Sequence, residues 1–241
     1  GGWALSRCVC FLRTPGAAAP GGGGGAAAGG GPPPPPGGGP HDHSGVRTEL
    51  VRMHTAVDEP AVRLVVEASG TVPAPARAPI RVGARVLLDP NPIDLAVPGA
   101  FDRLVEAVPP EALDRTALMR EAARATLAVP PVRIRGTLPG DLDRALDALP
   151  DDVEPVVLTT GTLVYVPGAE RQRFVDRVRE RGVHWIALER TGILRGVAAT
   201  PPDDVDAADP DAFATASIDG TAVAVSDPFG TRVRWFRDLN L

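Results

Sequence analysis

Short apolar runs alternate with amphipathic stretches along most of this chain. Four of these runs have the length and β-branched content of strands, and they cover residues 82–88, 132–135, 153–158 and 183–188. Apolar residues recur at helical spacing in neighbouring segments, at 99–108, 110–128, 141–149 and 168–181. Strands that alternate with helices predict an α/β domain with a Rossmann-like, mostly parallel sheet.

The regions before and after this alternation follow a different pattern. Apolar and polar residues alternate at 62–67, which predicts an antiparallel hairpin or flap. Near the C-terminus three strand-like runs follow one another, and Asp219-Gly220 joins the first two. Asp-Gly favours a tight hairpin because both residues tolerate positive φ. We therefore expect a C-terminal antiparallel meander on the edge of the sheet.

The first part of the chain has almost no side chains that could form a core. Residues 15–40 consist only of glycine, alanine and proline. Such a composition buries too little apolar area to offset chain entropy, so we predict that residues 1–46 are low-complexity and disordered and that residues 47–241 form one α/β domain. A flexible linker and a frameshifted stretch of GC-rich DNA both account for it. Because the chain begins at Gly1, we expect a fragment whose domain is incomplete on its N-terminal side.

Composition narrows the range of partners. All 25 residues counted as Lys or Arg are arginine, the formal net charge is −5 and the pI is near 5.4. Duplex binding depends on clustered cations, so we expect no nucleic-acid partner. No run approaches 18 apolar residues, so we expect no membrane partner. Cys8 and Cys10 make no disulfide framework, which favours a cytoplasmic location. A chain whose basic residues are all arginine is typical of a high-GC bacterial gene. The sequence predicts no oligomeric state.

Polar residues follow the ends of three predicted strands. In a wound α/β sheet, ligands bind outside the carboxyl ends of the parallel strands, so we expect a small-molecule site there. The candidate residues are Asp89, Asn91, Thr160, Thr162, Tyr165 and Glu189. We predict no metal site, because His41, Asp42 and His43 lack a supporting fold.

Each candidate also has a structural interpretation. Asp89 would accept hydrogen bonds from ribose hydroxyls, or it would cap the turn before Pro90. Tyr165 would orient a ligand, or it would pack with its hydroxyl at the surface. Glu189 has a functional and a structural interpretation with equal support. His184 lies inside an apolar strand and is expected to be a buried core histidine rather than a base. No catalytic residue is assigned, since no nucleophile elbow, P-loop or Ser/His/Asp arrangement occurs.

Parallel strands followed by antiparallel strands, with Asp89 and the Thr-rich end at 159–162, resemble the layout of class I S-adenosylmethionine-dependent methyltransferases. This resemblance implies that Asp89, Asn91, Thr160 and Thr162 bind the cofactor. It also implies that Tyr165 and Glu189 lie on the substrate side. The cofactor implied is S-adenosylmethionine.

In more detail, the chain resembles a mostly actinobacterial group, the domain of unknown function 2332 family, over residues 61–238. The resemblance depends on a strand that runs into Asp-Pro-Asn-Pro at 84–94 and on several shorter motifs, which lie at 132–136, 146–150, 156–167, 185–189, 227–230 and Trp235. The family looks like a divergent methyltransferase fold with a glycine-containing first loop, and nothing before Ala61 matches that loop. Thr137 stands where the family tends to have an acidic residue, and Asp141 follows only later; the turn at Phe229 lacks a histidine common in relatives.

Two functional hypotheses follow. The first is a truncated methyltransferase-like Rossmann domain, derived from an enzyme that binds an adenosyl cofactor. The second is a non-catalytic α/β module that binds a partner, or an inactive remnant. The missing glycine-rich loop favours the second hypothesis.

Overall fold

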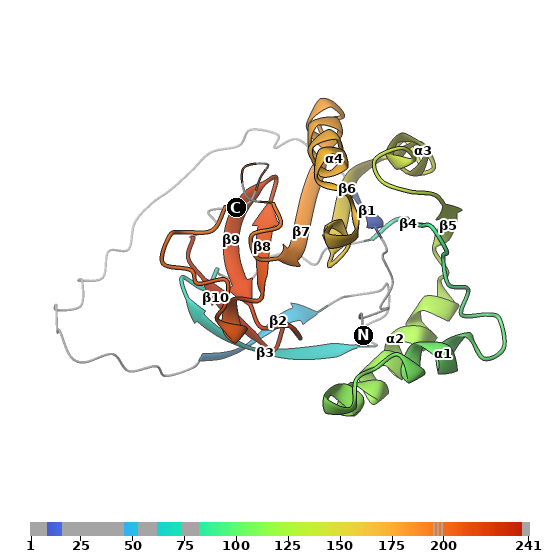
Figure 1. Ribbon diagram of the computed structural model, residues 1–241. Coiled ribbons are helices and arrows are strands. Elements are labelled where there is room, and N and C mark those ends of the chain that lie inside the picture. The colour runs from blue at the N-terminus through green and yellow to red at the C-terminus, as the bar shows by residue number, and fades with distance from the viewer. Residues whose placement is uncertain are drawn as a thin grey trace, which may run out of the picture.

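The structure, a computed structural model, describes residues 9–15, 46–52, 62–73, 82–194, 196, 198 and 200–237. In this part of the chain ten strands form one sheet (Figure 1). The strands are β1 (Val9–Pro15), β2 (Val46–Arg52), β3 (Arg63–Gly70), β4 (Arg85–Asp89), β5 (Val132–Arg135), β6 (Val153–Thr160), β7 (His184–Arg190), β8 (Ala214–Ile218), β9 (Thr221–Ser226) and β10 (Arg232–Trp235). Their spatial order is β2-β3-β10-β9-β8-β7-β6-β1-β4-β5.

The sheet is mixed and largely antiparallel. β4 and β5 are parallel neighbours, as are β6 and β7, and β1 lies between the two pairs and runs antiparallel to both β4 and β6. The four strands β4 to β7 therefore share one direction, as predicted. Among the described strands, however, six of the nine neighbouring pairs are antiparallel. The α/β class is confirmed, and the mostly parallel Rossmann-like sheet is not, because β1, the β2–β3 pair and the strands β7 to β10 all add antiparallel pairs.

Strand β1 comes from the segment that composition predicts to be disordered. Its seven residues pair with β6, from Val9 opposite Thr159 to Pro15 opposite Val153, and four of them also pair with β4. A strand needs only a few apolar residues in a row, and Val-Cys-Phe-Leu provides them. The glycine-, alanine- and proline-rich residues after β1, together with Cys8 and the histidine pair near residue 42, lie outside the described residues.

The C-terminal antiparallel meander is confirmed, but its expected place on the sheet edge is wrong, because β10 also pairs with β3. β7, β8, β9 and β10 pair antiparallel in succession. Asp219 and Gly220 have φ values of 49° and 79°, the positive values that a tight Asp-Gly hairpin requires. The next turn is closed by Asp227, whose carboxylate accepts hydrogen bonds from the Thr231 and Arg232 N–H groups at 2.6 and 3.0 Å. Burial opposes ionisation of Asp227, but these bonds outweigh it and lower its pKa.

The helices divide into two groups (Figure 1). α3 (Leu142–Asp147) and α4 (Gly168–Glu180) contribute to the main core, which they form with β4, β6 and β7. α4 buries Phe174, Val175 and Val178, the face predicted for it, and the Phe174 ring meets Trp185 edge-on at 5.4 Å. Arg177 of α4 and Arg181, which caps the C-terminal end of α4, donate hydrogen bonds to Asp143 of α3 and lower the pKa of its carboxyl.

The second group contains α1 (Ala100–Glu106), a 3-10 helix η1 (Pro110–Arg115) and α2 (Thr116–Ala128). The segment predicted as a single helix at 110–128 is thus divided into η1 and α2. α2 has no buried residue, and Ala117 and Ala122 of its predicted apolar face are exposed. None of the helices in the described ranges is both long and apolar enough to cross a membrane.

Candidate functional site

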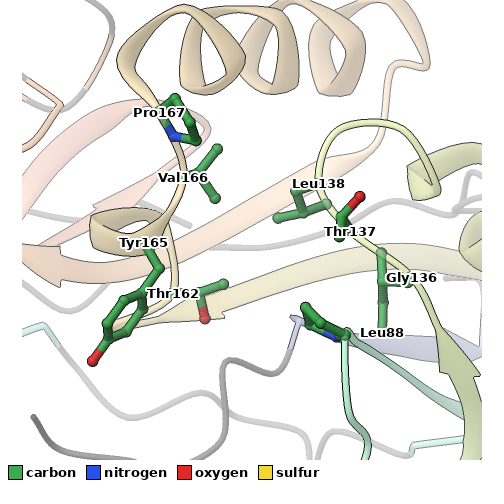
Figure 2. Close-up of a pocket in the computed structure, with 9 residues that line it drawn as sticks. Leu88, Gly136, Thr137, Leu138, Thr162, Tyr165, Val166 and Pro167 are labelled. Carbon is green, nitrogen blue, oxygen red and sulfur yellow. The ribbon is translucent and has the colours of Figure 1, made fainter.

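A pocket of about 190 Å³ opens at the carboxyl ends of β4, β5 and β6 (Figure 2). Nine residues line it: Leu88, Pro90, Gly136, Thr137, Leu138, Thr162, Tyr165, Val166 and Pro167. They come from three strand ends that share one direction, so the pocket occupies the position at which a wound α/β sheet binds ligands. The predicted location of the site therefore contains a pocket.

The walls of this pocket are mostly apolar and carry no charge, with hydroxyl groups on Thr137, Thr162 and Tyr165. Leu88 and Pro90 lie at the end of β4, and Thr162 to Pro167 form the opposite wall with the 3-10 helix η2 (Leu163–Tyr165). Figure 2 shows Leu138 extending toward Val166 and Thr162 from the loop that follows β5. None of the nine lining residues carries a charge. The pocket therefore suits a ligand with flat or apolar surfaces.

Asp89 lies between two lining residues but does not itself line the pocket. It is buried at 7% exposure, and its Oδ1 accepts a hydrogen bond from the Asn91 N–H at 2.6 Å. This contact is the turn-capping interaction that was one of its two interpretations. The backbone carbonyl of Asp89 also accepts from the Gly136 N–H, which holds the β5 end beside the β4 end.

Asn91 and Thr160 lie near the pocket without lining it. The side-chain oxygen of Asn91 accepts a hydrogen bond from Arg135 at 3.1 Å, so this amide links the β4 turn to β5. Thr160 is exposed at the end of β6, and its carbonyl accepts from the Thr162 hydroxyl at 3.3 Å. Both residues shape the loops around the pocket.

Thr162 and Tyr165 are the two predicted residues that line the pocket. Thr162 is buried, whereas Tyr165 is 44% exposed. Figure 2 shows the Tyr165 ring extending away from Leu138, with its hydroxyl at the far end. This placement favours the interpretation in which the hydroxyl lies at the surface.

Glu189 is the most buried ionisable candidate, at 1% exposure. Its Oε1 accepts a hydrogen bond from the Thr162 N–H at 3.2 Å, and its Oε2 accepts from the Leu163 N–H at 3.0 Å. The Thr159 hydroxyl bonds the same carboxylate and accepts from the Trp185 ring N–H at 3.1 Å. Burial raises the pKa of Glu189 to about 7, although these hydrogen bonds and Arg171 act in the opposite direction. Glu189 thus joins β7 to the pocket wall.

Asp141 lies beside Gly136 and Thr137 in the structure, although it follows them by several residues in sequence. The Asp141 carboxylate folds back and accepts a hydrogen bond from the Thr137 N–H at 2.8 Å. A Cβ on Gly136 would lie 2.5 Å from the Asp141 carboxyl carbon, so only glycine fits beside it. Asp141 therefore shapes the loop that carries Thr137 and Leu138.

His184 is not the buried core histidine that the sequence predicted. Its side chain is 60% exposed, and its Nδ1 lies 2.9 Å from Asp219 Oδ2. The hydrogen bond with Asp219 raises the pKa of His184. The error has a simple physical cause: alternate residues of β7 face opposite sides of the sheet, so Trp185 is buried and His184 is not.

Sequence reasoning missed the apolar half of the pocket. Leu88, Leu138 and Val166 are ordinary strand-end and loop residues, and no local signal separates them from core positions. Thr159 was also missed as a partner of Glu189, because their contact joins two strands. Within the described ranges, no group of three or more His, Cys, Asp or Glu side chains could hold a metal ion.

Fold and pocket together define an α/β domain with a mixed sheet and a small uncharged pocket at its strand ends. Residues 46–235 match the family described as "Uncharacterized protein conserved in bacteria (DUF2332)", and the chain belongs to this family. The predicted membership is confirmed, and the match begins earlier than the predicted residue 61, so that it includes β2. No curated protein and no solved structure matches the chain. The methyltransferase-like fold and the actinobacterial source stay predictions.

Proposed function

We propose that this domain binds the nucleoside portion of an adenosyl compound, such as S-adenosylmethionine, in the pocket at the ends of β4, β5 and β6. The observation that carries the proposal is the convergence of three strand ends on one uncharged, mostly apolar pocket, with Asp89 adjacent in sequence to the lining residues Leu88 and Pro90. Apolar walls suit a flat ring, and a carboxylate at a strand end suits a ribose diol.

The described residues fit only part of S-adenosylmethionine. A volume of about 190 Å³ is below the roughly 300–1,000 Å³ typical of small-molecule sites. The amino-acid end of the cofactor carries two charges, and none of the nine lining residues is charged. The pocket therefore matches the adenosyl end and not the whole cofactor, so we derive no methyl-transfer step.

A non-catalytic module that binds a macromolecular partner is the second candidate. The observation that favours it is β1, which lies antiparallel between β4 and β6. A glycine-rich cofactor loop would follow a strand that ends at the pocket edge, whereas β1 begins there, with Val9 opposite Leu88 and Thr159. In this alternative the pocket is a remnant of an ancestral binding site.

Calorimetry with adenosine and with S-adenosylhomocysteine tests the proposal. We expect both compounds to bind with similar affinity, because the homocysteine end gains no charged partner. Asp89→Asn should weaken binding by about 1 to 3 kcal/mol, since a charge-assisted bond to the ribose becomes a neutral one. Asp94→Asn is the control, because Asp94 also accepts a hydrogen bond from the N–H two positions later but is not adjacent in sequence to a lining residue, and its other oxygen pairs with Arg133.

Each outcome of this experiment decides a separate point. Equal affinity of the Asp89→Asn variant and the unchanged protein would reject the ribose role of Asp89. Equal weakening by the Asp89→Asn and Asp94→Asn variants would attribute the effect to the turn. No binding of either compound would reject the adenosyl site and favour the partner-binding module.

A further inference from the structure

One carboxylate holds the pocket wall that lies between β6 and α4. Four of the nine lining residues, Thr162, Tyr165, Val166 and Pro167, belong to the segment between β6 and α4. The first two N–H groups of this wall, those of Thr162 and Leu163, both donate to Glu189. Leu163 is fully buried and anchors η2 in the core. The position of the wall therefore depends on a side chain of the neighbouring strand.

The two hydrogen bonds go to different oxygens of the carboxylate. Thr162 donates to Oε1 and Leu163 donates to Oε2. An ionised carboxylate accepts at both oxygens, whereas a protonated one carries hydrogen on one of them and accepts poorly there. Protonation of Glu189 must therefore weaken one of the two bonds, whichever oxygen receives the proton.

The groups that the structure describes around Glu189 include no second acid that could share its proton. The Thr159 hydroxyl of β6 donates a hydrogen bond to the Glu189 carboxylate. Thr215 of β8 is the cross-strand neighbour of Glu189. The nearby charged group is Arg171 of α4, which favours the ionised form, and its Nη1 is held by the Ile193 carbonyl at 2.9 Å. No second carboxylate among the described residues acts on Glu189. Glu189 thus titrates as a single group.

We infer that Glu189 is the positioning residue of the pocket wall and that gain of a proton on its carboxylate loosens residues 161–167 and weakens ligand binding. The wall is fixed when Glu189 is ionised and loosened when it is protonated. Since burial places the pKa of this carboxyl at about 7, the change falls within the physiological range of pH. The ligand part of the inference rests on the proposed function, whereas the loop part does not.

The loop can be observed without any ligand. Tyr165 is the single tyrosine of the chain and lies in η2, so a ¹³C-labelled tyrosine gives one reporter in the wall. The hydrogen bond with Asp219 raises the pKa of His184, so the measurement uses His184→Gln protein as the reference, in which this second titrating group is absent. We expect the Tyr165 ring and the Leu163 amide to shift in one step near pH 7. We expect Leu163 protection from hydrogen exchange to be about tenfold lower below this pH than above it.

Glu189→Gln in the same background should abolish the step. A step that persists in Glu189→Gln, or a flat profile in the reference protein, would overturn the inference. If Glu189→Gln fails to fold, Thr159→Val serves instead: it removes a donor that lowers the pKa of Glu189, so the midpoint must move to higher pH. An unchanged midpoint in Thr159→Val would also overturn the inference.

Adenosine affinity provides the second measurement. We expect it to be up to about tenfold weaker at about pH 6 than at about pH 8 in the reference protein, and constant in Glu189→Gln. Suppose that adenosine does not bind at either pH while the Tyr165 and Leu163 signals still shift near pH 7. This result would reject the proposed function and leave the role of Glu189 in place. Binding with the same affinity at both values would reject the control of affinity by Glu189.

Discussion

Burial of Glu189 predicts that the free energy of unfolding decreases as pH rises from about 5 to about 8. The pKa of this carboxyl is about 7 in the folded protein and near the ordinary 4.5 in the unfolded chain. Between these values the folded state retains a proton that the unfolded state has released. The stabilisation is therefore present at low pH and is lost as pH rises through the folded pKa.

The magnitude follows from the two pKa values. Over this pH interval the linkage relation gives a loss of about 2.5 kcal/mol, which is a large part of the 5 to 15 kcal/mol typical of a domain. Glu189→Gln has no proton to lose at this site, so its stability should lack this slope. Asp143 and Asp227 have lowered pKa values and change charge below the interval.

Urea denaturation at several pH values is the assay. His184 acts in the same direction as Glu189, because its pKa is also raised, so both proteins carry His184→Gln. The slope is about 2 to 3 kcal/mol per molar urea. Between about pH 5 and about pH 8 the urea midpoint of the protein with Glu189 should therefore fall by about 1 M more than the midpoint of the Glu189→Gln variant. Midpoints that change in parallel would refute the reasoning.

Three further predictions concern the sheet. Val157→Asp places an unpaired carboxylate at a fully buried position of β6 and should abolish folding, so a soluble variant with a cooperative melt would contradict it. Gly161→Ala should lower the free energy of unfolding by about 1 to 2 kcal/mol, because alanine is strained at positive φ. Gly70→Ala should lower it clearly more, because the added Cβ would also lie 2.0 Å from the Trp235 carbonyl oxygen. Urea denaturation measures both values. Deletion of residues 1–15 should lower the melting temperature by about 10 °C, since β1 joins the two parallel strand pairs; an unchanged value would show that β1 is dispensable.

Local patterns predicted the elements that are determined locally. The four apolar runs became β4 to β7 in one direction, and Asp219-Gly220 made the expected hairpin. Strand pairing between distant segments produces no local pattern in the sequence. The short apolar run of β1 is indistinguishable from an isolated cluster until β4 and β6 are placed beside it. For this reason β1 was not predicted as a strand, and its antiparallel pairing with β4 and β6 was not predicted either.

The candidate site was predicted in the same uneven way. Thr162 and Tyr165 line the pocket, and Asp89 adjoins it, because strand ends are visible in the sequence. The binding of a cofactor by Asp89, Asn91, Thr160 and Thr162 stays a prediction, as do the substrate-side roles of Tyr165 and Glu189. The link from Glu189 to the Thr162 backbone could not be predicted, since it depends on the register between β6 and β7.

The position of β1 has a consequence for synthesis on the ribosome. β1 is the earliest of the described strands to be translated, yet its longest pairing is with β6, which is translated much later. β4 can offer a partial partner first, through four residue pairs. Until β6 emerges, β4 and β1 expose an unpaired edge of the kind that recruits other chains. The nascent chain therefore passes through a stage in which the unpaired edge of β1 is open to pairing with another chain.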